Sequence, residues 1–186
     1  LVPLTQSSFI VVVPGLIMGN PLVSALRLAV HRGAGLDAYA KNLAAHFQET
    51  LKKQFQARGV TIQTNILYSN QDDTGDIDFA LYESEINRLL LAQIKGFIFP
   101  DTVEEVFRAN EALEKGLEQT ERVRRWWNNL GSSQWPRALN ISASSTLPEV
   151  RFAVIGNGFS GSDYLEIPPD ITVLDAQYLL LSKFRG

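Results

Sequence analysis

Two short polar runs in the middle of the chain carry residue types suited to metal-assisted chemistry. In a segment that alternates like a β-strand, Asp76 and Asp78 fall on one face, opposite Ile77, Phe79 and Leu81. Gln93 and Lys95 share a face of the next expected strand by the same rule. Burying a lysine and an amide there costs several kcal/mol unless they have partners, and the carboxylate pair is the obvious partner. The pattern predicts either a structural ion pair or a site for a hard cation.

Composition narrows the metal chemistry that these residues could support. The chain has 186 residues, of which 45% are hydrophobic and 20% charged, and these values predict one globular domain with a sizeable core. It contains no cysteine and only two histidines, His31 and His46, which excludes zinc–thiolate, iron–sulfur and multi-histidine sites. Any metal would therefore be held by oxygen atoms, with Mg²⁺ or Mn²⁺ as the candidates.

Acidic residues concentrate in the middle third of the chain. Residues 70–121 hold four basic and thirteen acidic side chains, a net charge of −9. Residues 1–69 hold six basic and two acidic side chains (+4), and residues 122–186 hold seven and five (+2). A nucleic acid would therefore have to approach through a local basic rim around a negative centre, because the overall charge is only −3.

The longest apolar stretch, residues 9–30, does not read as a membrane span. It is interrupted by prolines, polar residues and a charge, at Pro14, Gly15, Asn20, Pro21 and Arg27. The start of the chain also lacks the cationic region, apolar run and small-residue cleavage site of a secretory signal. Together with the absence of cysteine, these features predict a cytoplasmic protein that does not interact with membranes.

Hydrophobic periodicity predicts an α/β fold with a mixed central sheet flanked by helices on both faces. Residues 1–35 are an N-terminal extension with a candidate strand at 9–13 and a candidate helix at 22–31, and residues 36–186 form the main domain. One helix is expected from an Asp37 N-cap to Gly59, and another from an Asp101 cap to about Leu130, acidic at its start and basic at its end. Expected strands span residues 60–68, 76–82, 88–95, 150–155 and 171–174, with an irregular loop at 131–148 and a last helix at 175–184.

The two polar runs resemble a known active-site signature. Gly75-Asp76-Ile77-Asp78-Phe79-Ala80-Leu81, followed one strand later by Leu91-Ala92-Gln93-Ile94-Lys95, is similar to the signature of the restriction-endonuclease-like PD-(D/E)XK nuclease superfamily in its Gln-x-Lys form. The expected order of helix, three strands, helix and strand over residues 36–156 also resembles that family's αβββαβ core. The resemblance implies a metal-dependent nuclease that hydrolyses phosphodiester bonds of nucleic acid, with DNA as the expected substrate and a homodimer as one arrangement compatible with the family.

The resemblance also implies roles for individual residues. Asp78 matches the family's acid, Gln93 its second ligand position and Lys95 its lysine, and the backbone carbonyl of Ile94 would be a further metal ligand. Asp76 could add a carboxylate to the set. The metal implied is Mg²⁺ or Mn²⁺, and the neutral Gln93 supplies less charge to it than the family's usual glutamate.

Other residues could contact the substrate. Gln48 lies on the flank of the apolar stripe of the first helix, where family members often place an acid, and Gln119 matches a glutamine that some branches bring to the phosphate; its alternative is an ordinary exposed glutamine. The run from Arg122 to Trp127 could grip phosphates and stack on bases, or it could be a basic helix end with tryptophans packed in the core. The cations in question are Arg122, Arg124 and Arg125.

Two other functions stay open on the sequence. A nuclease-like domain that has lost catalysis and serves binding or assembly would explain the glutamines at 48 and 93. Nucleotidyl transfer would use Asp76 and Asp78 as paired acids, although the expected Gly-Ser helix start does not precede them. Weaker patterns are the glycine-rich Gly156–Gly161 run, more typical of a loop than of a dinucleotide site because prolines follow, and the Arg27–His31 pair, more typical of surface neighbours.

Overall fold

The chain divides between Tyr39 and Ala40 into two units. The computed structural model describes residues 2–5, 8–10, 36–57, 60–69, 74–97, 100, 103–131, 133–143, 146–156, 161 and 165–175. In the first unit, β1 (Val2–Thr5) and β2 (Ser8–Ile10) form an antiparallel hairpin in which Val2 pairs with Ile10. The expected helix at 22–31 and the Arg27–His31 pair lie outside the described residues. Of the expected helix at 175–184 only Asp175 is described, and it is the last residue of a strand.

The second unit is built on a mixed five-stranded sheet. Its strands are β3 (Thr61–Ser69), β4 (Thr74–Glu83), β5 (Arg88–Ile94), β6 (Glu149–Gly156) and β7 (Ile171–Asp175), in that spatial order. β4 is antiparallel to both of its neighbours, β3 and β5, and β6 and β7 run parallel to β5. The predicted α/β class with a mixed sheet is confirmed, and the strand positions agree with the sequence to within two residues.

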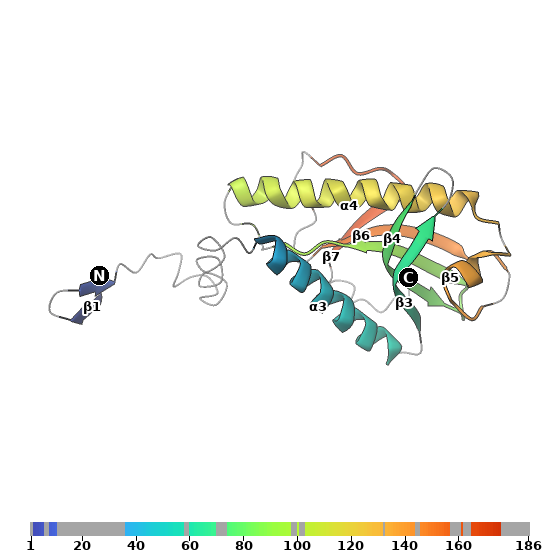
Figure 1. Cartoon of the computed structure of the whole chain (residues 1–186), viewed down its shortest axis with the longest axis horizontal. Helices are drawn as coiled ribbons and strands as arrows, with labels where there is room; N and C mark the ends of the chain where they lie inside the picture. The colour runs from blue at the N-terminus through green and yellow to red at the C-terminus, as the bar shows by residue number, and fades with distance from the viewer. Residues whose placement is uncertain are drawn as a thin grey trace. The chain divides into compact units, whose positions relative to one another are not determined.

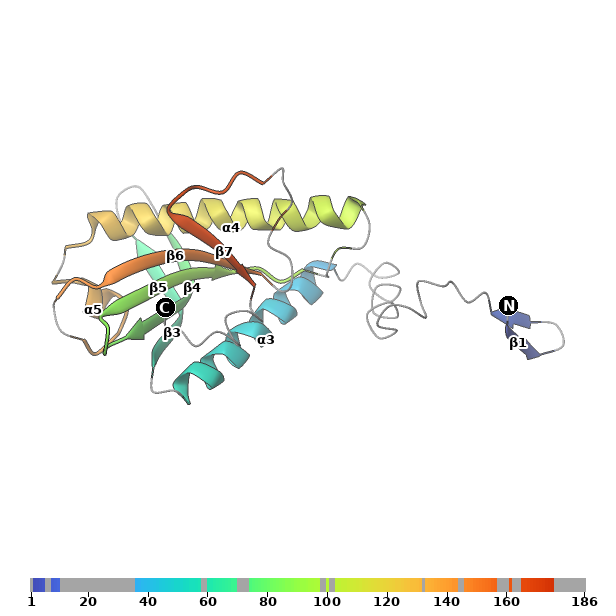
Figure 2. The ribbon, with the colours of Figure 1, turned by 180° about the vertical axis from the view of Figure 1, so that it is seen from behind.

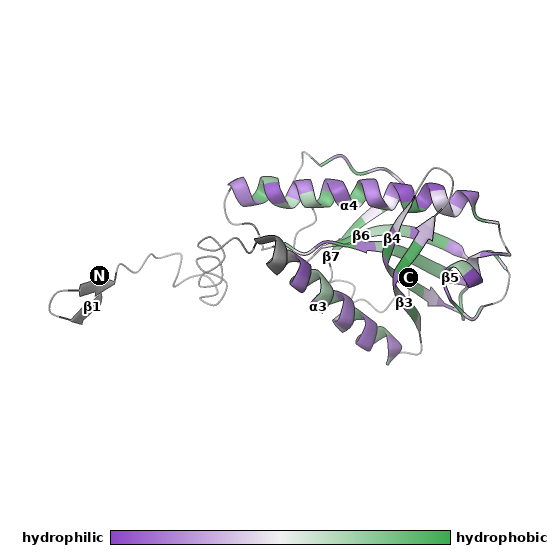
Figure 3. Ribbon diagram, viewed as in Figure 1, coloured by the Kyte–Doolittle hydropathy of each residue, from purple (hydrophilic) through white to green (hydrophobic). Residues whose placement is uncertain are grey.

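Two long helices cover opposite faces of this sheet (Figures 1 and 2). α4 (Val103–Asn129) packs on one face over a cluster that includes Leu89, Leu91 and Val154. From α3 (Leu36–Gln56), the buried side chains of Leu51 and Phe55 join a second cluster on the other face. Many residues of the strands are hydrophobic, whereas α4 is largely hydrophilic on its outer side (Figure 3). Among the described residues, no helix is long and apolar enough to span a bilayer.

The helix ends differ in detail from the sequence expectation. α3 begins at Leu36, so Asp37 lies inside the helix and is not its N-cap, while Asp101 lies outside the described residues. α4 has Glu104 and Glu105 in its first turn, as the helix dipole favours, but its last turn holds no basic residue. The helix ends at Asn129, close to the expected Leu130, but the arginines lie before its last turn. The expectation of a basic last turn was therefore wrong.

The segment expected to be an irregular loop contains a short helix, α5 (Trp135–Ala138). Pro136 stands in its first turn, where the fixed φ of proline suits a helix start and the missing N–H has no intrahelical role. Trp135 is fully buried, with its ring 5.2 Å from that of Tyr82 and 6.2 Å from that of Trp127. The helix forms because this tryptophan fills the core, an effect that local sequence pattern does not reveal.

Strict alternation along β4 does not hold across Asp78. Ile77 packs in the cluster under α4, whereas Phe79 and Leu81 pack in the cluster under α3. The expectation that these three residues share a face was therefore wrong. The adjacent strand explains the change: Asn65 of β3, with a left-handed φ of 54°, lies between the register pairs Thr64–Phe79 and Ile66–Ile77 and so faces Asp78.

Gly116 allows α4 to lie close to the sheet. A Cβ atom at this position would lie 2.8 Å from Cγ1 of Val154 and 3.1 Å from Cε of Lys95. We expect Gly116→Val to lower the free energy of unfolding by roughly 2 kcal/mol, because Val154 is buried and cannot move aside. Urea unfolding measures this, with exposed Glu114→Val as the control for β-branching in the same helix. Equal losses in the two variants would contradict close packing at Gly116.

Candidate functional site

The candidate site lies where β4 and β5 separate. Their ladder ends at the pair Phe79–Ala92. Beyond that pair, β4 continues toward Thr74 paired only with β3, and β5 continues to Ile94 paired with β6. Backbone groups that would have bonded across the ladder are left without a strand partner, so side chains must satisfy them.

Side chains of the predicted site residues take over these backbone bonds. The Ile94 N–H donates to Oδ2 of Asp78 at 2.7 Å, and Nε2 of Gln93 donates to the carbonyl of Asp76 at 2.6 Å. Gln93 is 1% exposed, which makes it one of the few buried polar residues of the described chain. The structure thus brings Asp76, Asp78, Gln93 and Ile94 together across one opening, although Asp78 and Gln93 bond to backbone atoms of the other strand.

Lys95 reaches the opening from the end of β5, on the α4 side. Its backbone N–H donates to the Ile155 carbonyl at 2.8 Å, which fixes the strand end against β6. Its ammonium group donates to Oε1 of Gln119, and its methylene chain passes under Gly116. Gln119 is therefore half-buried and in contact with a site residue. This placement does not match the alternative of an ordinary exposed glutamine.

Gln48 approaches the same opening from α3, on the other face of the sheet. Its Nε2 donates to the carbonyl of Asp78 and, at 3.1 Å, to Oδ1 of Asn65. Both amide hydrogens are thus used, and only Oε1 is left for another partner. Asn65 was missed by sequence reasoning. The available signal was an asparagine inside a strand pattern, since asparagine is depleted in strands and enriched at positive φ.

The charges of Asp78 and Lys95 are both disfavoured by the site. Burial raises the pKa of the Asp78 carboxyl above its ordinary 3.8, against the lowering effects of the Ile94 N–H and Lys95. Burial also lowers the pKa of the Lys95 ammonium below its ordinary 10.5, against the attraction of Asp78 and Asp76. Desolvation thus outweighs the attraction between the two residues, as expected for partly buried charges.

The donor atoms at the opening suit a hard cation. They are the Asp78 carboxylate, Oε1 of Gln93 and the Asp76 carboxylate, whose charge acts on both Asp78 and Lys95. The Ile94 carbonyl is a further donor, because it points to the same side of β5 as the Ile94 N–H. All are oxygens, the ligands that Mg²⁺ and Mn²⁺ prefer. No group of three acidic, histidine or cysteine residues that could hold a metal occurs in the described part of the chain. A metal here would depend on two carboxylates and on neutral oxygens.

The arginines near the end of α4 are not gathered at this opening. Arg122 lies one turn beyond Gln119 on the same side of the helix. Arg124 instead points toward the β7 end, where it bonds Glu121 at 2.7 Å and lies 3.4 Å from Asp170. Arg125 is exposed.

The neighbouring tryptophans belong to the core. Trp126 is 5% exposed and its ring lies 5.2 Å from that of Tyr68, while Trp127 is 7% exposed. Neither ring is placed to stack on a base.

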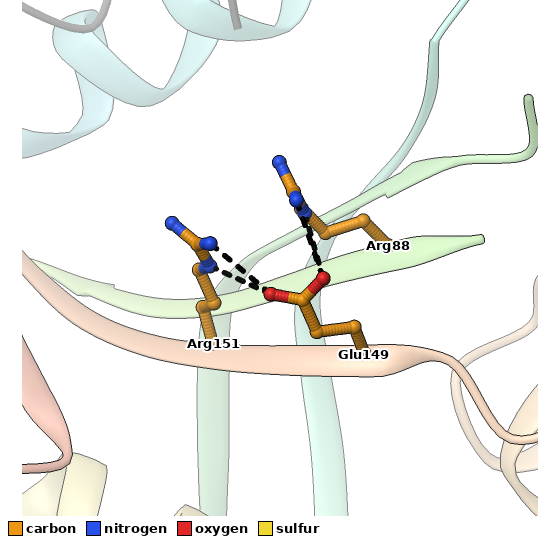
Figure 4. Close-up of polar contacts among 3 residues, drawn as sticks. All are labelled: Arg88, Glu149 and Arg151. Atoms are coloured by element: carbon orange, nitrogen blue, oxygen red, sulfur yellow. Dashed lines mark hydrogen bonds and ion pairs between the residues drawn. The ribbon is translucent and has the colours of Figure 1, made fainter. Parts of the chain in front are cut away.

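A second charged cluster lies at the opposite end of β5. Glu149 accepts hydrogen bonds from Arg88 on one oxygen and from Arg151 on the other, at 3.1 to 3.3 Å (Figure 4). Arg88 is six residues from Ile94 along the strand, which is about 20 Å. These charges satisfy one another on the sheet surface and do not line the opening at Asp78.

Only the two ends of the glycine-rich run, Gly156 and Gly161, are among the described residues. β6 ends at Gly156, and residues 157–160 lie outside the described part of the chain.

A scan against protein-family models, a search of curated proteins and a search of solved structures each found no match. The function of this protein therefore has to be inferred from the geometry of the opening between β4 and β5.

We expect Asp78→Asn to be more stable than the natural chain at neutral pH, by roughly 1 kcal/mol. The asparagine keeps an oxygen for the Ile94 N–H and removes a charge that the site disfavours. A raised folded-state pKa contributes stability that is present below the unfolded value and is lost as the pH rises through the folded value. The advantage of the variant should therefore disappear as the pH falls toward 3.8.

Urea unfolding followed by tryptophan fluorescence, in the absence of divalent cations, measures this difference. Asp76→Asn is the matched control, because Asp76 is exposed and its side chain should contribute little to stability. A less stable Asp78→Asn variant at neutral pH would show that the carboxylate is a structural ion-pair member.

Proposed function

We propose that this protein is a metal-dependent nuclease with a restriction-endonuclease-like core, acting on nucleic acid and most naturally on DNA. The observation that carries the proposal is the opening between β4 and β5, where Asp78, Gln93 and Lys95 converge with Gln119 beside them. The element order α3–β3–β4–β5–α4–β6, with three antiparallel strands followed by a parallel one, supports the same family.

The oxygen donors fit Mg²⁺ or Mn²⁺, with Asp78 and Asp76 as the charged ligands and Gln93 and Ile94 as neutral ones. Such an ion polarises a phosphate and lowers the pKa of an attacking water. Asp78 is held in place by the Ile94 N–H, which leaves its other oxygen available. The buried Gln93 is held by the Asp76 carbonyl, which directs Nε2 away and leaves Oε1 as its ligand atom.

Lys95 supplies the positive charge of the site. Held by Gln119 and by the contact with Gly116, its ammonium offsets negative charge that develops on a phosphate during hydrolysis. Its lowered pKa also makes it a better proton donor to a leaving oxygen than an ordinary lysine. Arg122, one turn along α4, extends this side of the helix as a phosphate contact.

Cleavage with Mn²⁺ or Mg²⁺ on single- and double-stranded DNA tests the proposal. We expect Lys95→Ala to lose at least a hundredfold in cleavage rate, because one charge stabilising the transition state is removed. Lys53→Ala, at an exposed position of α3, is the control and should cleave normally. Activity that survives in Lys95→Ala would remove the mechanism assigned to this lysine.

Two outcomes would favour the other functions. If the protein does not bind Mn²⁺ and cleaves neither DNA nor RNA, the reading as an inactive binding or assembly domain replaces the nuclease, as the neutral Gln93 would explain. Binding of a nucleoside triphosphate that requires both Asp76 and Asp78 would favour nucleotidyl transfer.

Gln93→Glu tests the donor set directly. A third carboxylate should tighten Mn²⁺ binding by about tenfold, while the free energy of unfolding without metal should fall. The fall is expected because a glutamate has no N–H for the Asp76 carbonyl and would be a buried charge. Isothermal titration with Mn²⁺ and urea unfolding measure the two effects. Unchanged metal affinity would place the metal away from residue 93.

A further inference from the structure

Asn65 occupies an unusual place relative to the site. It is a non-glycine residue with a left-handed φ of 54° in the middle of β3, and the register on either side of it places it opposite Asp78. Asparagine accepts this conformation more readily than most residues, but it still carries a cost that the surroundings must offset.

The faces of both strands invert at this pair of residues. On β3, Ile62 packs in the cluster under α3, whereas Ile66 packs against the cluster under α4. On β4, Phe79 and Ile77 invert in the same way. In a regular strand, residues two or four apart share a face, so each strand turns over between its paired residues. The β4–β5 ladder ends at the residue that follows Asp78, which is the opening of the site.

The side chain of Asn65 acts on the same point. Its Oδ1 accepts a hydrogen bond from Gln48 at 3.1 Å, and the same amide nitrogen of Gln48 donates to the Asp78 carbonyl. Asn65 therefore acts on β4 at Asp78 in two ways. Its backbone turns the strand over, and its side chain holds the Gln48 amide, which we call the clamp, on the Asp78 carbonyl.

We infer that Asn65 is a positioning residue for the Asp78 carboxylate. Its left-handed backbone opens the sheet beside Asp78, and its side chain orients Gln48 on the Asp78 carbonyl, so that the carboxylate reaches the Ile94 N–H. The relevance of this placement to metal binding and cleavage rests on the proposed nuclease function, whereas the placement itself does not.

The chain offers a matched set of variants. Asn65→Gly and Asn65→Ala both remove the side-chain acceptor, but only glycine takes a positive φ without strain. Their difference therefore isolates the backbone conformation. Asn140 also has a left-handed φ, of 53°, and an exposed side chain, so Asn140→Ala is the control for the same strain at another position. Asn140 contacts β3 through its backbone carbonyl, which accepts from Gln63 at 2.8 Å, and alanine keeps that acceptor. Gln48→Leu removes the clamp and leaves Asn65 intact, which keeps a test available if Asn65→Ala does not fold.

Hydrogen exchange at the Ile94 amide is the primary measurement, because that N–H bonds the Asp78 carboxylate. We expect Asn65→Ala to speed exchange at Ile94 by about tenfold relative to Asn65→Gly. Gln48→Leu should also speed it, and Asn140→Ala should leave it unchanged. The inference is overturned if glycine and alanine at 65 give equal exchange, if Asn140→Ala has the same effect, or if Gln48→Leu has none.

Mn²⁺ titration of the same variants separates this inference from the proposed function. If the natural chain binds Mn²⁺, affinity should fall in Asn65→Ala and be largely kept in Asn65→Gly. If the natural chain binds no Mn²⁺ but Ile94 exchange follows the expected order, the nuclease proposal fails and the positioning of Asp78 by Asn65 stands.

Discussion

The hydrogen bond from the Ile94 N–H to the Asp78 carboxylate is the interaction on which the site depends. It crosses the gap where β4 and β5 stop pairing and replaces a backbone bond that the ladder no longer makes. The Asp78 carboxylate accepts the unpaired backbone N–H at the end of the ladder with one oxygen, and its other oxygen stays available for another partner. Gln93, the residue before Ile94, makes a similar contact: its Nε2 donates to the Asp76 carbonyl, and its Oε1 stays available. The side chains that complete the strand ends are thus the same ones to which the proposed function assigns chemistry.

This arrangement bears on the two interpretations that the residue pattern left open, a structural ion pair and a site for a hard cation. Burial outweighs the attraction between Asp78 and Lys95 and shifts both pKa values in the direction that favours the neutral forms. Lys95 is held by the neutral Gln119 on α4. A group of charges that the fold holds at a cost is typical of a site that gains its stability when a ligand binds.

The two helices contribute to the site from opposite faces of the sheet. α4 supplies Gln119 and, through Gly116, the close approach that confines the Lys95 side chain. α3 supplies Gln48, whose amide donates to the Asp78 carbonyl and to Asn65, where the strands turn over. The opening is therefore accessible to side chains of both layers, whereas a regular sheet would separate them. The cations beyond Gln119 are divided, with Arg124 engaged by Glu121 and Asp170 on the far side of α4.

The sequence by itself determined the α/β class and the strand positions, because alternation and periodicity are local and each strand carries its own pattern. Only the tertiary structure decided the rest. The faces of β4 invert at Asp78, opposite Asn65 on another strand. Trp135 of α5 is buried against Tyr82 and Trp127, and Trp126 is buried against Tyr68. Each of these depends on contacts between residues remote in sequence, and such contacts leave no mark in a local pattern.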